Sequence, residues 1–532
     1  MKRLGPVLIS CLVAVEAFCQ DDAVKAAMYI HGLSCEEEVQ KWMVESLQGL
    51  RPVSVNSPGR NAGALLSEYQ LASLEDYRSR FGDILSYEEL SLVDGFSKEA
   101  VAALKPYLSL YSKRLPGSVD TVRTKTLGLL RVTEKNAGGK LKLTGASWQA
   151  AGALRASIQD GARFTGSAHL QASWKDWALT LGDYNVRYGQ GLSLWSGFSM
   201  TSLSTPDAFI RRPAGISPLW SFTSPEHRGA ALEYGTGHFR ACAFAAVDGF
   251  AGAHADYLWR YGQVGLSTAL QDAGRLSFSA DTRLNIRGVD LAGEAALGRG
   301  SYALNGSGGL RAGPVRLVFQ GRAMPSRYTG KKYGEYGLAA GAAWKSDSRK
   351  HSVSLTLDGA LLPVPVTATD RRQLRIYAMW KWQISESLAL ESRYTGRLRN
   401  YEPSRNDLRV DARFAGGPWL SSFRLEAVHC DSFGILSYLE GGYKDTSLSA
   451  YLRITAYATG GWNSRIYCYE RDAPGNFSVP AYSGRGVCGS IYGGWKKRFG
   501  RAALKLYLRG SLAAAVSKPP SGTLRLQAQF EY

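Results

Sequence analysis

Segments in which apolar and polar residues alternate recur through most of this chain, and this pattern limits the available folds more than any other feature. The last such segment covers residues 522–532 and ends at the chain terminus. One side of it would carry Leu524, Leu526, Ala528, Phe530 and Tyr532. A period of two predicts a strand with one apolar and one polar face. Taken alone, this strand fits the edge of a soluble β-sandwich as well as it fits a barrel.

The polar faces of the alternating segments favour the barrel. Residues 351–361, 374–384 and 448–456 repeat the alternation. The charged residues on these and similar polar faces include Arg375, Lys381, Glu391, Arg393, Arg453, Lys505 and Arg509. A dry sandwich core would not accept so many charges, whereas a membrane barrel places them in a wet lumen and turns its apolar face to lipid. We therefore predict a mainly β fold, with a large antiparallel transmembrane β-barrel of roughly 20–24 strands over residues 117–532; a large soluble β-sandwich or repeat array is the alternative.

Both ends of the chain point to the outer membrane. Residues 1–19 have the order of a signal peptide: two basic residues, an apolar core and small residues at the cleavage positions. The aromatic end of the last alternating segment resembles the C-terminal assembly signal of outer-membrane barrels. This resemblance implies that Phe530 and Tyr532 act in barrel assembly, and that membrane lipid and the outer-membrane assembly machinery are partners.

Charge divides the chain into two parts. Residues 20–116 contain ten Lys or Arg and fourteen Asp or Glu, a net charge of −4. The formal charge of the whole chain is +19, so residues 117–532 carry +22 once the +1 of residues 1–19 is removed. The excess positive charge therefore belongs to the predicted barrel, and the small segment is acidic.

The acidic segment, residues 20–116, has helical rather than alternating spacing, which predicts a small all-α domain. Residues 36–50 form an amphipathic pattern with Ser34 as a candidate N-cap. Ser86 and Glu89 have the spacing of a capping box. Gly95 stands where a turn between two helices requires a positive φ.

A spaced motif covers residues 77–90. Its members are Tyr77, Arg78, Gly82, Ile84, Ser86, Glu89 and Leu90. With its flanks it resembles the tandem helix-hairpin-helix domain of the competence DNA-receptor type. The resemblance implies two hairpins that dock a partner protein or DNA, with the candidate residues Ser67, Glu68, Tyr69, Asp94, Gly95, Phe96, Ser97 and Lys98.

The hairpins depart from the nucleic-acid-binding pattern of that family. In such members a glycine-rich hairpin offers backbone N–H groups to phosphate. Here the first hairpin has no glycine, and Ser97 replaces the second glycine of the other. Because phosphate neutralisation supplies most non-specific affinity, a domain with a charge of −4 favours a protein partner over DNA.

Residues 177–228 interrupt the alternation. They include a glycine-aromatic segment with Tyr188, Gly189, Gln190, Gly191 and Trp195. It is similar to the GQG segment of outer-membrane barrels that carry a helix-hairpin-helix domain. The two glycines are no dinucleotide-binding fingerprint, because a third glycine and a βαβ context are missing. We predict that the region near 188–228 folds into the lumen or covers one mouth; an ordinary surface loop is the alternative.

No arrangement of residues in the sequence indicates catalysis. The seven histidines lack metal-ligand spacing, and Ser196 and Ser483 lack a readable base partner. We expect no enzyme activity, no cofactor and no metal, with a barrel-embedded hydrolase as a weak alternative. Cys468 and Cys488 could bridge one loop or serve as small apolar side chains.

The leading functional hypothesis is an outer-membrane channel or envelope scaffold. Its helix-hairpin-helix domain would lie in the periplasm and dock a periplasmic or outer-membrane protein. The alternative is a DNA-uptake component that binds DNA through the same domain.

Overall fold

The computed structural model describes most of the chain apart from its first residues and several short segments. The described residues are 22–48, 50, 52–58, 62–63, 65–112, 125–157, 163–197, 203–271, 275–286, 288–298, 300–328, 334–348, 350–362, 371–516 and 518–532. The predicted signal peptide and the predicted domain boundary near residue 116 lie outside them.

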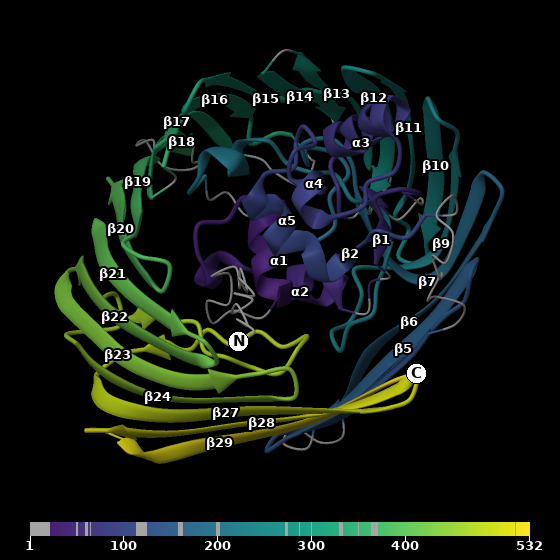
Figure 1. The fold of residues 1–532 in the computed structure, drawn as a ribbon. Coiled ribbons are helices and arrows are strands. Elements are labelled where there is room, and N and C mark those ends of the chain that lie inside the picture. Colours follow the sequence, from purple (N-terminus) through teal and green to yellow (C-terminus); the bar gives the residue numbers. More distant parts are fainter. Residues whose placement is uncertain are drawn as a thin grey trace, which may run out of the picture.

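The dominant feature is a closed antiparallel barrel of 24 strands, seen along its axis in Figure 1. Its strands are β3 (Lys125–Thr133), β4 (Asn136–Thr144), β5 (Trp148–Ser157), β6 (Arg163–Trp174), β7 (Trp177–Arg187), β9 (His227–Gly235), β10 (Phe239–Ala246), β11 (Ala251–Trp259), β12 (Gly262–Gln271), β13 (Arg275–Ile286), β14 (Val289–Gly298), β15 (Ser301–Ala312), β16 (Val315–Met324), β17 (Glu335–Lys345), β18 (His351–Leu362), β19 (Arg371–Gln383), β20 (Leu388–Arg399), β21 (Arg405–Gly416), β22 (Trp419–Cys430), β23 (Ser432–Lys444), β24 (Leu448–Thr459), β27 (Arg485–Phe499), β28 (Ala502–Ala515) and β29 (Lys518–Glu531). The predicted fold class is confirmed, and the strand number lies within the predicted range.

The last strand closes the barrel against the first. β29 pairs with β3, from Arg525 opposite Thr133 to Glu531 opposite Leu127. Beyond it, the backbone N–H of Tyr532 donates to the carbonyl of Thr126 at 2.9 Å, and the Thr126 N–H donates back at 2.8 Å. The terminal alternating segment is therefore the seam of the barrel, because its backbone groups complete the ring of hydrogen bonds.

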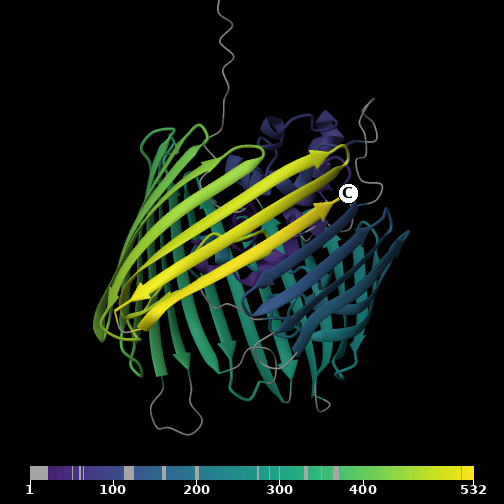
Figure 2. The same ribbon diagram turned by 90° about the horizontal axis from the view of Figure 1, so that it is seen from below.

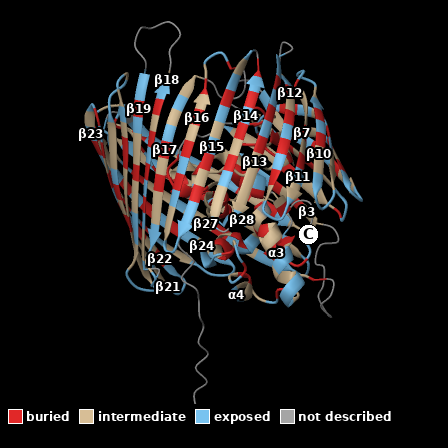
Figure 3. Cartoon of the chain, turned by 90° about the horizontal axis from the view of Figure 1, so that it is seen from above, coloured by how far each residue is buried: buried red, intermediate tan, exposed pale blue. Residues whose placement is uncertain are grey.

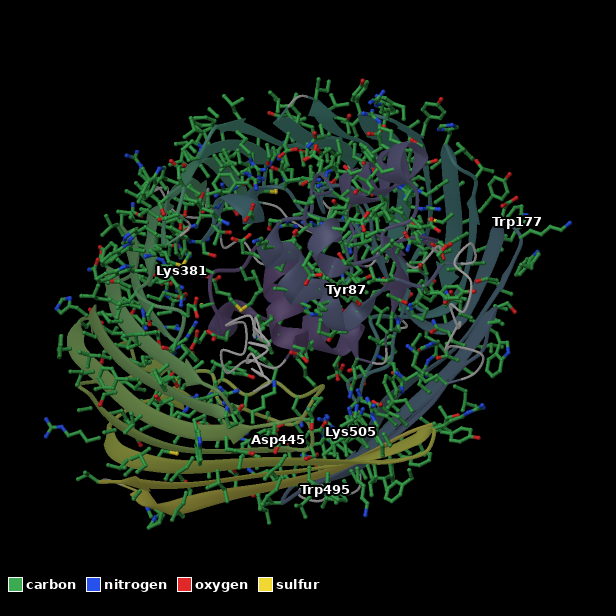
Figure 4. All side chains as sticks on the ribbon, in the orientation of Figure 1. Tyr87, Trp177, Lys381, Asp445, Trp495 and Lys505 are labelled. Carbon is green, nitrogen blue, oxygen red and sulfur yellow. The ribbon has the colours of Figure 1, made fainter. Side chains whose placement is uncertain are left out.

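The two faces of the wall differ as the alternation predicts. In β18, Val353, Leu355 and Leu357 are exposed on the outside, whereas Thr356 and Asp358 between and after them are buried inside. Figure 3 shows the same change of burial along many strands. Aromatic residues near strand ends, such as Trp177 in Figure 4, project from the outer surface. The outer face thus has the apolar character that lipid requires.

The two ends of the barrel have different connections. At the end that holds the C-terminus, here called the C-terminal mouth, the links are short, as at 145–147, 175–176, 260–261 and 313–314. The opposite end, the loop mouth, carries two long loops. The first loop is described for residues 188–197 and 203–226 and contains η4 (Pro206–Phe209) and β8 (Gly215–Pro218); the second loop, residues 460–484, contains the pair β25 (Ile466–Tyr467) and β26 (Ala481–Tyr482).

The described part of residues 22–112 forms a small helical domain. Its elements are α1 (Asp22–His31), η1 (Glu36–Glu38), α2 (Lys41–Leu47), β1 (Val53–Ser54), α3 (Glu68–Phe81), α4 (Tyr87–Leu90), α5 (Lys98–Leu104), η3 (Lys105–Tyr107) and β2 (Leu108–Ser109). β1 and β2 form a parallel pair that joins the segment after α2 to the last part of the domain. No helix in the described chain is both long and apolar enough to cross a bilayer.

The helical domain lies inside the ring of strands rather than beside it. Figure 1 shows its helices within the ring, and Figure 2 places them toward the C-terminal mouth. The sequence predicts this segment as a separate appendage, so its position in the lumen is a correction. Several of the predicted inner-face charges, such as Glu391, Arg453 and Arg509, are buried rather than placed in a wet lumen. Lys381 is 46% exposed, as the prediction requires.

The helical domain confirms one of its predicted caps and differs from the predictions at two other places. Ser86 caps α4 by accepting the Glu89 N–H, as its spacing predicts. The predicted helix over residues 36–50 is instead divided into η1 and α2. Ser34 is not an N-cap: its hydroxyl donates to the Glu38 carboxylate at 2.9 Å. The Ser34 N–H also donates to that carboxylate, at 2.8 Å, so Ser34 contacts a side chain rather than a helix N–H.

Candidate functional site

The strongest contact between the helical domain and the barrel joins two glutamates of η1 to three arginines of the wall. This arginine cluster consists of Arg409 and Arg413 on β21 and Arg424 on β22. Glu37 Oε2 lies 2.8 Å from Arg409 Nη1, and Glu37 Oε1 lies 2.5 Å from Arg424 Nη1. Arg409 and Arg424 come from the central part of their strands, so the contact lies inside the lumen.

Glu36 occupies the other side of the arginine cluster. Its Oε1 lies 3.4 Å from Arg413 Nη2, and its Oε2 lies 3.7 Å from Arg409 Nη2. Glu36 is 6% exposed and Arg409 is 1% exposed, so these charges are removed from water. Buried ions of this kind are tolerated only when each has an opposite charge and hydrogen bonds.

The electrostatics of the pair favour ionised glutamates. Burial alone would raise the pKa of Glu37, but Arg409 and Arg424 lower it well below its ordinary value. Burial has the same upward effect on the pKa of Glu36, and Arg413 with Arg409 brings it below the ordinary value. Both side chains therefore remain carboxylates at neutral pH.

A second contact holds α2 against another part of the wall. Glu45 accepts hydrogen bonds from Lys140 Nζ at 3.3 Å and from the Ser221 hydroxyl at 2.7 Å. Lys140 stands on β4, whereas Ser221 belongs to the first loop. One buried carboxylate thus links the domain, the wall and a loop. The Arg187 guanidinium also lies 3.7 Å from the centre of the Trp42 ring, in cation–π contact.

Two further ion pairs lie at the C-terminal mouth and are exposed. Lys345 Nζ lies 3.4 Å from Glu99, and the Arg260 guanidinium lies 3.9 Å from Asp76. Exposed pairs contribute little, typically about 0–1 kcal/mol each. They mark where the helical domain meets the rim of the barrel, but they contribute too little to hold the domain in the lumen.

The second loop completes the hydrophobic core of the helical domain. Tyr469 is buried in that core, and Phe477 and Val479 pack against it. The Tyr469 N–H also donates to Glu37 Oε1 at 3.1 Å, so the loop contributes to the glutamate contact. No local sequence pattern identifies this loop, because it begins almost 350 residues after the end of the domain that it contacts.

The glycine-aromatic segment turns around one buried carboxylate of the wall. Glu294 on β14 accepts backbone hydrogen bonds from Gln190 at 2.7 Å, Leu192 at 3.0 Å and Ser193 at 3.2 Å. Tyr188 stacks on the His254 ring at 4.1 Å, and Trp195 lies below the Arg211 guanidinium. This part of the first loop therefore lies in the lumen. Nothing in the sequence distinguishes Glu294, the residue that holds it, from the other polar residues of the inner face.

The two glycines of this segment are required by conformation and by space. Gly189 has φ +63° and Gly191 has φ +86°, in the left-handed region. A Cβ on Gly189 would lie 2.7 Å from a Glu294 carboxylate oxygen, and a Cβ on Gly191 would lie 2.6 Å from Arg211. Glycine at these positions lets the backbone approach the carboxylate closely.

The residues of the two predicted hairpins lie together in the helical domain. Ser67 caps α3 in a capping box with Gln70, and Ser97 caps α5. Glu68 and Lys98 begin these helices, and Phe96 is buried between them. The Tyr69 hydroxyl donates to Asp94, and the amide of Gly95, at φ +81°, donates to Asp94 Oδ1 at 3.0 Å. The backbone amide that a phosphate would use is therefore already bound by a carboxylate.

Other chemistry-bearing residues are dispersed or structural in the described chain. His254 contacts the Ser267 hydroxyl at 2.8 Å and Asp256 at 3.1 Å, all on the inner face of β11 and β12. No three His, Cys, Asp or Glu side chains gather as metal ligands among the described residues. Cys468 and Cys488 are both free and buried, in one apolar cluster.

Together these features define a large β-barrel of the outer-membrane type whose lumen is occupied by its own N-terminal domain. No family model matches the sequence, and no curated protein matches it either.

Comparison with solved structures finds other large barrels. The translocation pore of the P pilus usher PapC is 11% identical with a TM-score of 0.38, over 77% of this chain and 98% of that one. The E. coli P pilus tip assembly intermediate PapC-PapD-PapK-PapG matches at 11% identity and a TM-score of 0.46, over 80% of this chain and 63% of that one. The siderophore receptor PirA from Pseudomonas aeruginosa matches at 9% identity and a TM-score of 0.42, over 77% of this chain and 80% of that one. The likeness is one of fold alone.

Proposed function

We propose that this protein is a gated outer-membrane channel that its own helical domain closes at rest. The observation that carries the proposal is the buried contact of Glu36 and Glu37 with the arginine cluster. In outer-membrane barrels the short turns face the periplasm and the long loops face outward. The C-terminal mouth, and with it the exposed part of the helical domain, would then be periplasmic.

The nature of the contact supports a gate that can open. The apolar core of the helical domain is built mostly from its own residues. Its contacts with the wall are ionic or polar, as at Glu37 and Glu45. A domain with its own core can move without unfolding, and carboxylate–arginine contacts can be exchanged for other ions. Opening requires, in addition, that Tyr469 and its loop leave the domain.

Conductance of the full-length protein in planar bilayers tests the proposal. The Glu36→Lys, Glu37→Lys double variant places two lysines beside the three arginines of the cluster. The five positive charges repel one another, so the domain should leave the arginine cluster and the conductance should rise strongly. Glu99→Lys is the matched control, because Glu99 is exposed at the mouth; it should behave as the parent. A double variant that folds as a barrel and remains as silent as the parent would overturn the gate.

A protein partner in the periplasm is the second element of this proposal. Phe81, Leu85 and Leu92 of the helical domain are exposed, by 72%, 63% and 78%. Exposed apolar side chains of this size support docking of a protein with an apolar surface. A Leu85→Asp, Leu92→Asp variant should lose a protein that co-purifies with the parent from membranes in mild detergent. Equal recovery from both would remove this docking role.

The terminal residues are proposed to act in assembly. Phe530 on the closing strand is 45% exposed, and Tyr532 just after the strand is 63% exposed. They are thus available to the assembly machinery before the seam closes. Tyr532→Ala should lower the amount of folded protein in the outer membrane, and an unchanged amount would remove this role.

We also infer that the chain is not an enzyme, with a barrel-embedded hydrolase as the alternative. The observation that favours the alternative is the hydrogen-bonded series Ser267, His254 and Asp256. Against it, Tyr188 covers the imidazole, and Ser196, the serine noted in the sequence, accepts the Val186 N–H. Labelling of Ser267 by a fluorophosphonate, lost in Ser267→Ala, would establish the hydrolase. DNA uptake remains a prediction.

A further inference from the structure

We infer that the arginine cluster is a binding site for an oligocarboxylate solute, and that Glu36 and Glu37 occupy it as a resident substitute for that solute. The inference rests on the proposed gate and names the chemical class of the ligand that opens it. The ligand would carry at least two carboxylates on neighbouring positions, as a small tricarboxylic acid or an acidic oligopeptide does.

The arginine cluster is held in place by the wall itself. Asp411 accepts a hydrogen bond from Arg424 Nε at 2.7 Å and another from Arg409 Nε. The Arg424 guanidinium also lies 5.2 Å from the centre of the Tyr438 ring. Because Asp411 takes the Nε donors, the Nη donors of both arginines point to the glutamates. Two of the three arginines are therefore positioned by the wall without the helical domain.

The contacts match carboxylates on two neighbouring residues. Glu37 is shared by Arg409 and Arg424 and receives one backbone N–H from Tyr469. Glu36 is held mainly by Arg413, at 3.4 Å. Guanidinium groups fixed in this way recognise planar carboxylates through directed pairs of N–H donors. Two carboxylates in separate subsites favour an oligocarboxylate over a monocarboxylate.

Burial explains why opening needs a ligand. When the domain leaves, the three arginines and the neighbouring Arg393 would face three wall carboxylates: Asp411, Glu426 and, at 3.9 Å from Arg413, Glu391. The wall then carries more positive than negative charge at this place. Removal of one partner from a buried ion pair is costly, because it leaves the other charge uncompensated. A solute that brings its own carboxylates replaces those of Glu36 and Glu37 and offsets this cost. Because it binds the open state alone, it shifts the equilibrium toward opening.

Hydrogen exchange of residues 36–47, measured on the full-length protein in detergent, tests the inference. A Glu-Glu-Glu tripeptide and the small tricarboxylate tricarballylate should each increase exchange there in a saturable manner. Gln-Gln-Gln, and acetate at equal ionic strength, should not. An effect of the tripeptide alone identifies the solute as an acidic peptide, and an effect of tricarballylate alone identifies it as a small acid. An equal effect of inorganic phosphate, or no effect of either oligocarboxylate, overturns the inference.

Two variants move the response in opposite directions. Glu36→Gln removes one resident carboxylate, so the half-maximal concentration of tricarballylate should fall. Arg413→Gln removes part of the site for the solute, so the largest exchange that the solute can induce should decrease. Arg311→Gln, an exposed arginine near the rim, should change neither value. A lower half-maximal concentration cannot result from misfolding of the site, so an unchanged value in Glu36→Gln overturns the inference.

The gate and the ligand can fail separately. If the Glu36→Lys, Glu37→Lys variant conducts but no oligocarboxylate changes exchange in the parent, the gate stands and the ligand inference is wrong. If that variant does not conduct, the proposed gate itself is wrong, whatever the solutes do.

Discussion

The helical domain meets the barrel in two kinds of ionic contact, and they differ mainly in burial. Deep in the lumen, Glu37 contacts Arg409 and Arg424, which are 1% and 2% exposed. At the C-terminal mouth, Glu99 contacts Lys345, and both side chains are more than half exposed. The same chemistry should thus have very different effects. Water screens the pair at the mouth, whereas breaking the deep pair removes one carboxylate partner from two arginines that are buried away from water.

The largest effect is expected from Glu37→Gln. The substitution preserves size but leaves Arg409 and Arg424 without their shared carboxylate, and breaking a buried pair typically costs about 3–5 kcal/mol. The domain should therefore spend much more time away from the wall. Hydrogen exchange of residues 36–47 in the full-length protein measures this cost, and the unchanged exchange of strands remote from the site serves as the control for a folded barrel.

Acid should weaken the deep contact but not at mildly acidic pH. The pKa of Glu37 is lowered well below its ordinary value when the domain is bound, because the two arginines outweigh burial. The stabilisation is fully present above the ordinary Glu pKa of about 4.3 and is lost as the pH falls through the lowered value. Exchange of residues 36–47 should hence be flat from neutral pH to about pH 5, after correction for intrinsic rates, and rise below about pH 4.

The Glu36→Gln, Glu37→Gln variant provides the control for this pH dependence. It lacks both titrating carboxylates, so its corrected exchange should be high and nearly independent of pH over the same interval. A parent-like rise in the variant would assign the pH dependence to other groups.

Gly189→Ala extends the comparison of buried and open positions to the first loop. Alanine at Gly189 would meet both a left-handed φ and a Cβ only 2.7 Å from Glu294. The expected loss is about 1–3 kcal/mol of local stability, seen as faster exchange of residues 188–195. Gly313→Ala is the matched control: its φ is +58°, but its Cβ would have nothing within 4 Å, so it isolates the backbone strain.

Local signals explain which parts of this architecture could be predicted. The alternation of β18 and β29 is a property of neighbouring residues, so the barrel and its closing strand follow from sequence. The opposite charges of the domain and the barrel are also visible in the sequence, but on their own they predict a partner outside the chain as readily as a contact within it. The pairing of Glu37 with Arg409 depends on residues more than 370 positions apart, and no local pattern encodes it. The role of Glu294 is not predictable for the same reason, because the backbone groups that it binds lie about a hundred positions earlier in the chain.

The smallest effect is expected at the mouth. Glu99→Gln removes the partner of Lys345, but water can solvate the lysine once the pair is broken, so the loss should be no more than about 1 kcal/mol. Exchange of residues 98–104 at low and at moderate salt measures it. The difference between parent and variant should shrink with salt, because exposed charges are screened. A loss at Glu99 as large as that at Glu37 would show that burial does not rank these contacts, and the deep arginine cluster would then lose its special place in the gate.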